Sequence, residues 1–271
     1  MADVDGETLQ VSGQPAGESR SSAGAGTAPQ SASAYLNPSY WDERFAEEEH
    51  YEWLKDYSHF RHLVRRHVRP FHSVLEVGCG SSRLSEALLE DGVSDITSCD
   101  ISEVAVEMMR KRLQGKGLKG IKVLVADMLS LPFDDDCFDI VIEKGTMDVL
   151  FVDSGDPWNP RLETVDKVKA MLEGVHRVLK PNGTFISISF GQPHFRRRFF
   201  EDPELTWSFE YETFGEEFHY FFYVLKKGQR ASDETNRDSG EEFIPPPIQY
   251  LHEELEDEDF IFRTSVDELN A

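Results

Sequence analysis

Residues 73–82 read SVLEVGCGSS, and this stretch decides the fold. Its apolar first half is typical of a short, buried strand of a parallel sheet. Gly78 and Gly80 then break the strand, and one of the two serines at its end can cap a helix over 82–90. A strand, a glycine turn and a helix N-terminus open a nucleotide-type crevice, because the glycines let a ligand approach the backbone and the helix end presents free N–H groups.

A Gly-x-Gly turn alone is weak evidence, since many strand-to-helix turns carry it only for their geometry. Two acidic strand ends strengthen the functional interpretation. Strand 96–100 ends in Asp100, about 20 residues after the glycines, where a ribose-binding carboxylate belongs. Strand 121–126 is followed by Asp127. Arg83 occupies the position of the third glycine of a dinucleotide motif, which argues against a bound pyrophosphate.

Strands and helices continue to alternate along the chain. Further strands are expected at 138–143, 184–190, 207–212 and 218–225, and helices at 103–113 and 162–179. A stop-and-turn signal at 180–183 precedes the strand at 184–190. This alternation predicts an α/β, Rossmann-like doubly wound fold, whose seven-stranded sheet is mostly parallel and ends in an antiparallel hairpin.

The chain of 271 residues suits one domain with two tails. Residues 1–34 are rich in Ser, Ala and Gly, and we expect them to be disordered before a domain over 35–230. Residues 231–271 are polar and acidic, and we expect a largely disordered tail there as well. A few apolar residues in that tail leave open a short interaction motif.

The charge of the chain limits its partners. A formal net charge of −23 argues against direct binding of nucleic acid, because phosphate contacts need a basic surface. A basic protein would be attracted, although the acidity could serve solubility alone. Three scattered cysteines give no metal-ligand spacing, and we expect no metal. The absence of a secretory signal or a membrane-length apolar run predicts a cytoplasmic protein without membrane contact. The oligomeric state is left open, with a monomer slightly favoured.

The order of these motifs resembles the class I methyltransferases that depend on S-adenosylmethionine. The matching motifs are Glu76-x-Gly78-x-Gly80 after the first strand, Asp100 after the second and Asp127 after the third. The resemblance covers roughly residues 40–227, and it implies the fold expected above with S-adenosylmethionine as the cofactor. An amide-methylating Asn-Pro-Pro-Tyr motif is absent from the loop after strand 138–143.

Each part of such a cofactor needs a partner. Asp100 would accept hydrogen bonds from the ribose hydroxyls, and Asp127 would accept one from the adenine amino group. Met128 or Ile101 would flank the adenine ring. Glu76 would reach the ammonium of the methionine end or order the glycine loop, since an unpaired buried carboxylate is costly. The alternatives are a helix-capping role for Asp100 and a surface turn for Asp127.

Residues 40–45 read YWDERF, which places aromatic and charged side chains at helical spacing. As a lid, Trp41 and Phe45 would close over the cofactor, and Arg44 would pair with the methionine carboxylate. A helix that simply packs on the sheet would use the two aromatic side chains equally well.

Residues 143–148 read EKGTMD and follow the fourth strand at the edge where ligands bind in this fold. We expect this loop to position the acceptor, with Glu143, Lys144 and Asp148 as candidate catalytic residues. For a general base, Asp148, His194 and Tyr220 remain alternatives.

The stretches YWDERF at 40–45, EKGTMD at 143–148 and PHFR at 193–196 resemble a narrower family, the eukaryotic lysine methyltransferases of translation elongation factor 1-alpha. The resemblance implies methyl transfer to a lysine of that folded protein, and it implies that the loop at 143–148 is needed for activity. It implies cofactor contacts at Trp41, Phe45, Gly78, Asp100, Ile101, Asp127, Met128 and Lys144. Phe45 departs from a tyrosine that relatives can carry, so a hydrogen bond there is doubtful. The alternatives are a small-molecule methyltransferase and a non-catalytic module that binds the cofactor.

Overall fold

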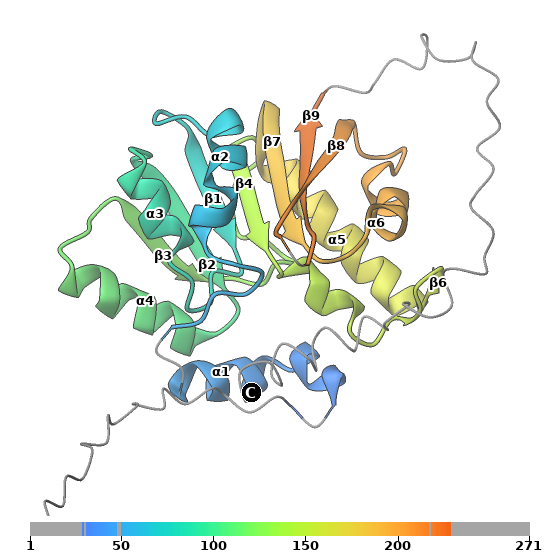
Figure 1. The fold of residues 1–271 in the computed structure, drawn as a ribbon, viewed down its shortest axis with the longest axis horizontal. Coiled ribbons are helices and arrows are strands. Elements are labelled where there is room, and N and C mark those ends of the chain that lie inside the picture. Colours follow the sequence, from blue (N-terminus) through green and yellow to red (C-terminus); the bar gives the residue numbers. More distant parts are fainter. Residues whose placement is uncertain (1–28, 30, 48–49, 217, 229–271) are drawn as a thin grey trace, which may run out of the picture.

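A seven-stranded sheet in the order β3-β2-β1-β4-β7-β9-β8 runs through the middle of the protein (Figure 1). The computed structural model describes residues 29, 31–47, 50–216 and 218–228. The strands are β1 Ser73–Val77, β2 Asp95–Asp100, β3 Ile121–Val125, β4 Phe138–Lys144, β7 Leu179–Ser189, β8 Trp207–Phe214 and β9 Tyr220–Lys227.

The direction of the strands confirms the predicted fold class. The five strands from β3 to β7 in this order are parallel, and β9 runs antiparallel to both β7 and β8. In the centre of the sheet, Leu75 of β1 pairs with Thr97 of β2 on one side and with Val141 of β4 on the other. The chain thus forms a Rossmann-like, mostly parallel sheet with an antiparallel hairpin at its C-terminal side.

Helices cover both faces of this sheet (Figure 1). Their bounds are η1 Ala32–Leu36, α1 Pro38–Glu47, α2 Tyr57–His67, α3 Leu84–Glu90, α4 Glu103–Gly115, η2 Met147–Phe151, α5 Leu162–Val178 and α6 Pro193–Phe200. The Ser102 hydroxyl accepts a hydrogen bond from the Ala105 N–H, as expected of an N-cap. A small ribbon of β5 Gly155–Asp156 and β6 Asn159–Pro160 lies between η2 and α5.

The hydrophobic core is divided by the sheet, because successive strand residues point to opposite faces. Val74 and Ile140 pack in a cluster with side chains of α2 and α3. Leu75 and Val141 pack in the other cluster, which includes Val168, Met171, Leu172 and Val175 of α5. The predicted buried strands and the apolar face of α5 are therefore confirmed.

The expected turn at 180–183 is wrong as a strand boundary, because β7 begins earlier, at Leu179. Leu179 pairs with Phe138, and the next pair of the ladder is Thr184 with Ile140. The residues between them form a bulge in which Asn182 has a φ of 65°. The local turn signal therefore describes the bulge, while the pairing with β4 continues across it.

The N-terminal elements begin slightly before the expected start of order at Tyr35, since η1 starts at Ala32 and buries it. Residues 1–28 and 30 of the tail expected at 1–34, and the whole tail expected at 231–271, lie outside the described residues. Within the described part of the chain, no helix combines the length and the apolar character that crossing a membrane requires.

Candidate functional site

A cavity of about 290 Å³ lies at the carboxyl ends of β1, β2 and β4, where the sequence predicted a ligand crevice. Most of the predicted site residues line this cavity: Trp41, Phe45, Glu76, Gly78, Gly80, Asp100, Ile101, Asp127, Met128 and Lys144. Among the described residues, Arg44, Glu143 and Asp148 are predicted site residues that do not line it. The parallel strands bring the two acidic strand ends to the glycine turn.

The glycine turn is held tightly between neighbouring elements. The N–H groups of Gly78 and Cys79 both donate to the Cys99 carbonyl, at 2.8 and 3.0 Å. Gly78 has a φ of 70°, and a Cβ there would overlap the Thr146 side chain. A Cβ at Gly80 would lie 3.0 Å from the Phe45 ring. Both glycines therefore let other parts of the chain approach the turn, in addition to exposing its backbone to a ligand.

Asp100 ends β2 with its carboxylate fixed by backbone donors. The N–H groups of Gly80 and Ser102 donate to its two oxygens at 2.8 and 2.9 Å. Burial raises the pKa of the Asp100 carboxyl, whereas these two hydrogen bonds act in the opposite direction. An ionised carboxylate has about four acceptor sites, so it keeps capacity for the two hydroxyls of a ribose.

The loop after β3 forms the opposite wall of the cavity. The Asp127 carboxylate accepts a hydrogen bond from the Leu129 N–H at 2.9 Å, which fixes the turn that carries Met128. Ile101 keeps 41% of its surface exposed beside the cavity. An acceptor oxygen with apolar side chains nearby suits the amino group and the faces of an adenine ring.

Glu76 is the buried carboxylate of the cavity. Its Oε2 accepts hydrogen bonds from the hydroxyls of Ser85 and Ser98, the latter at 3.0 Å. Burial raises the pKa of Glu76 to about 7, against the effect of these hydroxyls. A carboxylate in this state would gain from a cation bound in the cavity, as the predicted contact with an ammonium requires.

The N-terminal helix α1 closes one side of the cavity with aromatic rings. Trp41 stacks on Phe45 with 5.7 Å between the ring centroids, and its indole N–H donates to the Tyr35 carbonyl at 2.8 Å. Arg44 does not line the cavity among the described residues, and its guanidinium lies 4.8 Å from the centroid of the Trp53 ring. It also donates to the Tyr40 hydroxyl at 3.1 Å. A contact between Arg44 and a cofactor carboxylate therefore stays a prediction.

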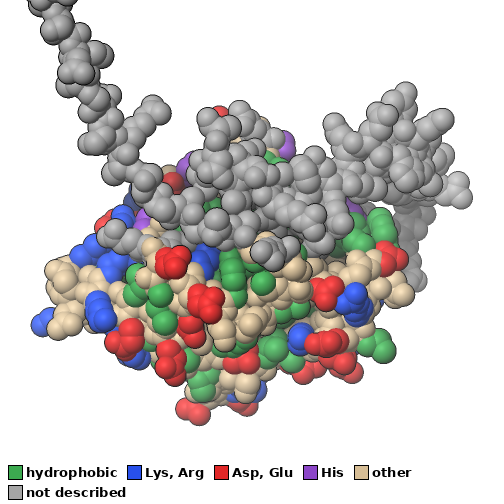
Figure 2. Space-filling view, turned by 90° about the horizontal axis from the view of Figure 1, so that it is seen from below, with side chains coloured by type: hydrophobic (Ala, Val, Ile, Leu, Met, Phe, Trp, Pro, Cys, Tyr) green, Lys and Arg blue, Asp and Glu red, His purple; other side chains and the backbone are tan. Residues whose placement is uncertain are grey.

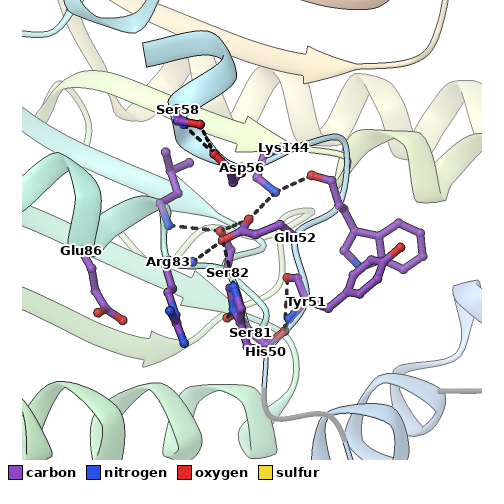
Figure 3. Close-up of polar contacts among 12 residues, drawn as sticks. His50, Tyr51, Glu52, Asp56, Ser58, Ser81, Ser82, Arg83, Glu86 and Lys144 are labelled. Carbon is purple, nitrogen blue, oxygen red and sulfur yellow. Dashed lines mark hydrogen bonds and ion pairs between the residues drawn. The ribbon is translucent and has the colours of Figure 1, made fainter. Parts of the chain in front are cut away.

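A polar cluster that sequence reasoning missed joins residues 50–53 to the glycine turn (Figure 3). Glu52 accepts hydrogen bonds from the Ser82 hydroxyl at 2.9 Å and from the Arg83 N–H at 2.7 Å. It also pairs with the Lys144 ammonium at 3.0 Å. The side chains of Glu52 and Lys144 are 14% and 5% exposed. We call this arrangement the Glu52 clasp.

The Glu52 clasp places a second set of side chains on the cavity. Lys144 also donates to the Trp53 carbonyl at 2.6 Å, and the Tyr51 N–H donates to the Ser81 hydroxyl at 3.0 Å. Tyr51 and Trp53 line the cavity together with Ser81 and Ser82. The aromatic pair at 51 and 53 was the only sequence signal for this segment, because its partners lie about 30 and about 90 positions away.

Glu143 and Asp148 face the protein interior, which differs from the direct contact expected of catalytic residues. Glu143 is fully buried and accepts hydrogen bonds from the Ser187 hydroxyl and from the N–H groups of Thr146 and Met147. Asp148 is 1% exposed and pairs with Arg196 at 2.8 Å. Burial and the nearby Asp148 raise the pKa of Glu143 to about 7. Both carboxylates thus shape the loop at 143–148.

The other two candidate bases, His194 and Tyr220, pack against aromatic side chains. The His194 ring stacks on the exposed ring of Trp158, with 5.2 Å between their centroids. Tyr220 packs against an aromatic cluster that includes Tyr35 and Phe190. Neither His194 nor Tyr220 is among the described residues that line the cavity, and the assignment of a general base to either stays a prediction.

Comparisons with known proteins identify the family of the chain. A family model described as a methyltransferase domain matches residues 71–223. EEF1A lysine methyltransferase 4 of Bos taurus is 38% identical over 75% of this chain and 80% of that protein. EEF1A lysine methyltransferase 4 of Mus musculus is 34% identical over 84% of this chain and 91% of that protein. The crystal structure of the cyclase SpnF is 14% identical with a TM-score of 0.51, over 72% of this chain and 93% of that chain, which shows the fold alone.

The fold, the crevice and the matching family model together define a methyltransferase. With 34% and 38% identity over most of both chains, the protein belongs to the family of the EEF1A lysine methyltransferases. This membership confirms S-adenosylmethionine as the cofactor predicted from the sequence. The cavity fits that molecule, because Asp100 keeps acceptor capacity for a ribose and the buried carboxylate of Glu76 lines the cavity, where it would suit an ammonium.

Proposed function

We propose that this protein transfers a methyl group from S-adenosylmethionine to the side-chain amine of a lysine in elongation factor 1A. The cavity at the carboxyl edge carries this proposal, because the motif residues of the cofactor line one wall and aromatic side chains line the other. The substrate follows from the names of relatives that are 34% and 38% identical over most of the chain.

The residues of the chain have three tasks in this reaction. S-adenosylmethionine supplies an electrophilic methyl group on a positively charged sulfur. Asp100 and Asp127 orient the ribose and adenine, and Glu76 balances the positive charge at the methionine end. The rings of Trp41, Phe45, Tyr51 and Trp53 exclude water from the cavity. Positioning of this kind can supply effective molarities of about 10⁵ M or more.

The acceptor must arrive as a neutral amine. A free lysine has a pKa of about 10.4, and burial against apolar rings lowers the pKa of an amine. A cationic sulfonium nearby lowers it further, because like charges disfavour each other. The neutral amine nitrogen would accept the methyl group that the cofactor supplies, and the methylated amine would then lose one proton to water. The aromatic wall formed by Tyr51, Trp53 and Trp41 suits this requirement.

Glu143 and Asp148 act as positioning residues in this proposal. Glu143 accepts hydrogen bonds from the N–H groups of Thr146 and Met147, and Thr146 lies against Gly78 in the wall of the cavity. Lys144, between Glu143 and the glycine after it, ties the same loop to Glu52. The loop at 143–148 would thus fix the place of the acceptor rather than take its proton.

The same proposal covers the setting of the protein. We expect it in the cytoplasm, as a monomer over one domain at 35–230, without direct nucleic-acid or membrane partners. The net charge of −23 would favour encounter with a basic protein surface.

The proposal is tested with purified components. Elongation factor 1A and methyl-labelled cofactor are incubated with the protein, and mass spectrometry of digested product locates the label. We expect methylation of one lysine. Label on a small metabolite with no protein present would instead indicate a small-molecule methyltransferase, and cofactor binding without turnover would indicate a non-catalytic module.

A further inference from the structure

An exposed tryptophan marks the carboxyl edge of the sheet outside the cavity. Trp158 lies between β5 and β6 and keeps 67% of its surface exposed. Leu162, the first residue of α5, is 80% exposed. Large apolar side chains exposed together mark interaction sites more often than scattered ones do. The mechanism proposed above uses neither residue.

The Trp158 side chain is held in place although it is exposed. Its ring stacks on His194 and meets Phe195 at 64°, with 5.0 Å between those centroids. Arg198 donates to its carbonyl at 2.9 Å, and its own N–H donates to Asp156 at 2.9 Å. We call Trp158, His194 and Phe195 the Trp158 platform. A fixed aromatic surface loses little conformational entropy when a partner covers it.

The platform lies at the same edge of the sheet as the cavity. The ribbon that carries Trp158 follows the carboxyl end of β4, and α6 follows the carboxyl end of β7. Figure 1 shows β6 at the lower edge of the molecule, on the side where α1 lies. Figure 2 views the molecule from this side, and its described part carries acidic, basic and apolar side chains interspersed.

A buried ion pair joins the platform to the cavity wall. Arg196, which follows Phe195 in α6, is fully buried and pairs with Asp148 of η2 at 2.8 Å. Its guanidinium lies 3.7 Å from the centroid of the Phe151 ring. The helix η2 also places Val149 and Leu150 in the cavity lining. The ion pair therefore links α6, which carries His194 and Phe195, to η2, which contributes to the cavity lining.

Two cations near the platform are paired within the chain, whereas Arg198 and Asp156 make hydrogen bonds to the backbone of Trp158. Arg161 pairs with Asp153 at 2.8 Å, and Lys167 pairs with Glu163 at 2.6 Å. Paired charges offer a partner little net field, so these two ion pairs leave the exposed ring as an apolar contact for a partner.

We propose that the Trp158 platform docks the folded protein whose lysine enters the cavity. This inference rests on the proposed lysine methylation. A lysine side chain has a stem of only four carbons, so the surface that carries it must lie against the carboxyl edge during the reaction. A fixed, exposed tryptophan at that edge matches the composition of interface hot spots. The contact is to an apolar side chain of the substrate protein near its target lysine.

The test compares Trp158→Ala with Phe71→Ala. Phe71 is 81% exposed and precedes the amino end of β1, at the opposite edge of the sheet, so it is a matched control. We measure binding to elongation factor 1A, its methylation, and binding of S-adenosylmethionine. For W158A, we expect the Kd for the protein and the KM to rise about 30-fold, the size of a hot-spot loss. We expect kcat and cofactor affinity to change less than twofold, no effect of F71A, and partial rescue in Trp158→Phe.

Other outcomes separate the two proposals. Equal effects of W158A and F71A, or no effect of W158A, would overturn docking at the platform. A wild-type protein that fails to bind the factor would overturn it as well. If the wild type binds but transfers no methyl group, the proposed function fails, and the effect of W158A on binding still decides the role of the platform. If the wild type self-associates and W158A abolishes this association, the surface binds a second copy of the chain, and docking of the substrate protein there is overturned.

Discussion

The cofactor half of the cavity consists of the glycine turn, Asp100 and Asp127, which follow three successive strands that pair side by side. The acceptor half consists of residues 50–53 and the loop at 143–148, which come from separate parts of the chain, and the Trp158 platform lies outside the cavity at the same edge of the sheet. In the first half, polar groups face the cavity. In the second, the charged groups Glu52, Lys144, Glu143 and Asp148 are bonded to the chain itself.

This difference indicates how the two halves work. Backbone N–H groups fix Asp100 and Asp127 while leaving acceptor capacity for a ligand, so these residues should act on cofactor affinity directly. The charged residues of the acceptor half hold loops and leave the cavity to aromatic rings, so they should act through position. Four experiments can break or sharpen this division.

The largest effect is expected from Asp100→Ala. Hydrogen bonds to a charged group contribute about 1.5–3 kcal/mol, so loss of the ribose contacts should raise the Kd for S-adenosylmethionine about 100-fold. Titration calorimetry measures this change. Asp95→Ala, at the exposed opposite end of the same strand, is the control and should bind as the wild type does. Unchanged affinity in Asp100→Ala would remove the ribose assignment.

The next effect is expected from the pair Glu143→Ala and Glu143→Gln. Alanine leaves the buried donors of Thr146, Met147 and Ser187 without an acceptor, which should lower the free energy of unfolding by about 2–3 kcal/mol and kcat by tenfold or more. Glutamine can still accept the N–H groups, so kcat should stay within about threefold. Rate assays and denaturant unfolding measure both quantities.

The glutamine variant is the decisive member of this pair. A proton acceptor cannot be replaced by an amide, so a kcat for Glu143→Gln as low as that for Glu143→Ala would show that Glu143 acts in catalysis itself.

A smaller effect is expected from the Glu52 clasp. Glu52→Gln leaves the ammonium of Lys144 buried without its counter-charge, and the Kd for S-adenosylmethionine should rise about tenfold as residues 50–53 loosen. The double variant Glu52→Gln with Lys144→Met should recover part of the loss, because neither charge remains. Glu107→Gln removes an exposed paired carboxylate on α4 and serves as the control. Additive effects of the two substitutions would argue against the clasp.

The smallest expected effect is the release of protons when the cofactor binds. With a pKa of about 7, Glu76 is about half protonated at pH 7 in the free protein. A bound cation favours the carboxylate and lowers this pKa, so cofactor binding at pH 7 should release up to about half a proton. Calorimetry in buffers of different ionisation enthalpy measures the release.

Two variants assign this release to one half of the cavity. Glu76→Gln should abolish the proton release. Glu143→Gln should leave the release unchanged, because Glu143 is not one of the described residues that line the cavity. Proton uptake, or a release lost in both variants, would contradict the contact between Glu76 and the cofactor.

The pKa values also predict how stability changes with pH. Burial raises the pKa of Glu76 and of Glu143 in the folded protein to about 7, from the ordinary value of 4.5 for a glutamate. Between these pH values the folded protein binds more protons than the unfolded chain, so stability should fall as pH rises from about 4.5 towards and through 7.

Much of the cofactor half could be predicted because it depends on local patterns. A glycine turn and an acidic residue at the end of a strand are readable from short stretches, and parallel strands bring their carboxyl ends to one edge. Asp100 and Asp127 therefore line the cavity as expected. The sequence also marked the loop at 143–148, but it could not give the direction of its side chains. A strand residue points to one face or the other, and Glu143 pairs with Ser187 inside the sheet.

The sequence by itself determined the order of strands and helices, the fold class and the cofactor motifs, since hydrophobic period and turn residues act over a few positions. Only the tertiary structure decided that Glu52 meets Lys144, that Asp148 pairs with Arg196, and that Trp158 stands exposed at the carboxyl edge of the sheet. These contacts join segments roughly 40 to 90 positions apart, and they form only once packing of the sheet has brought the segments together.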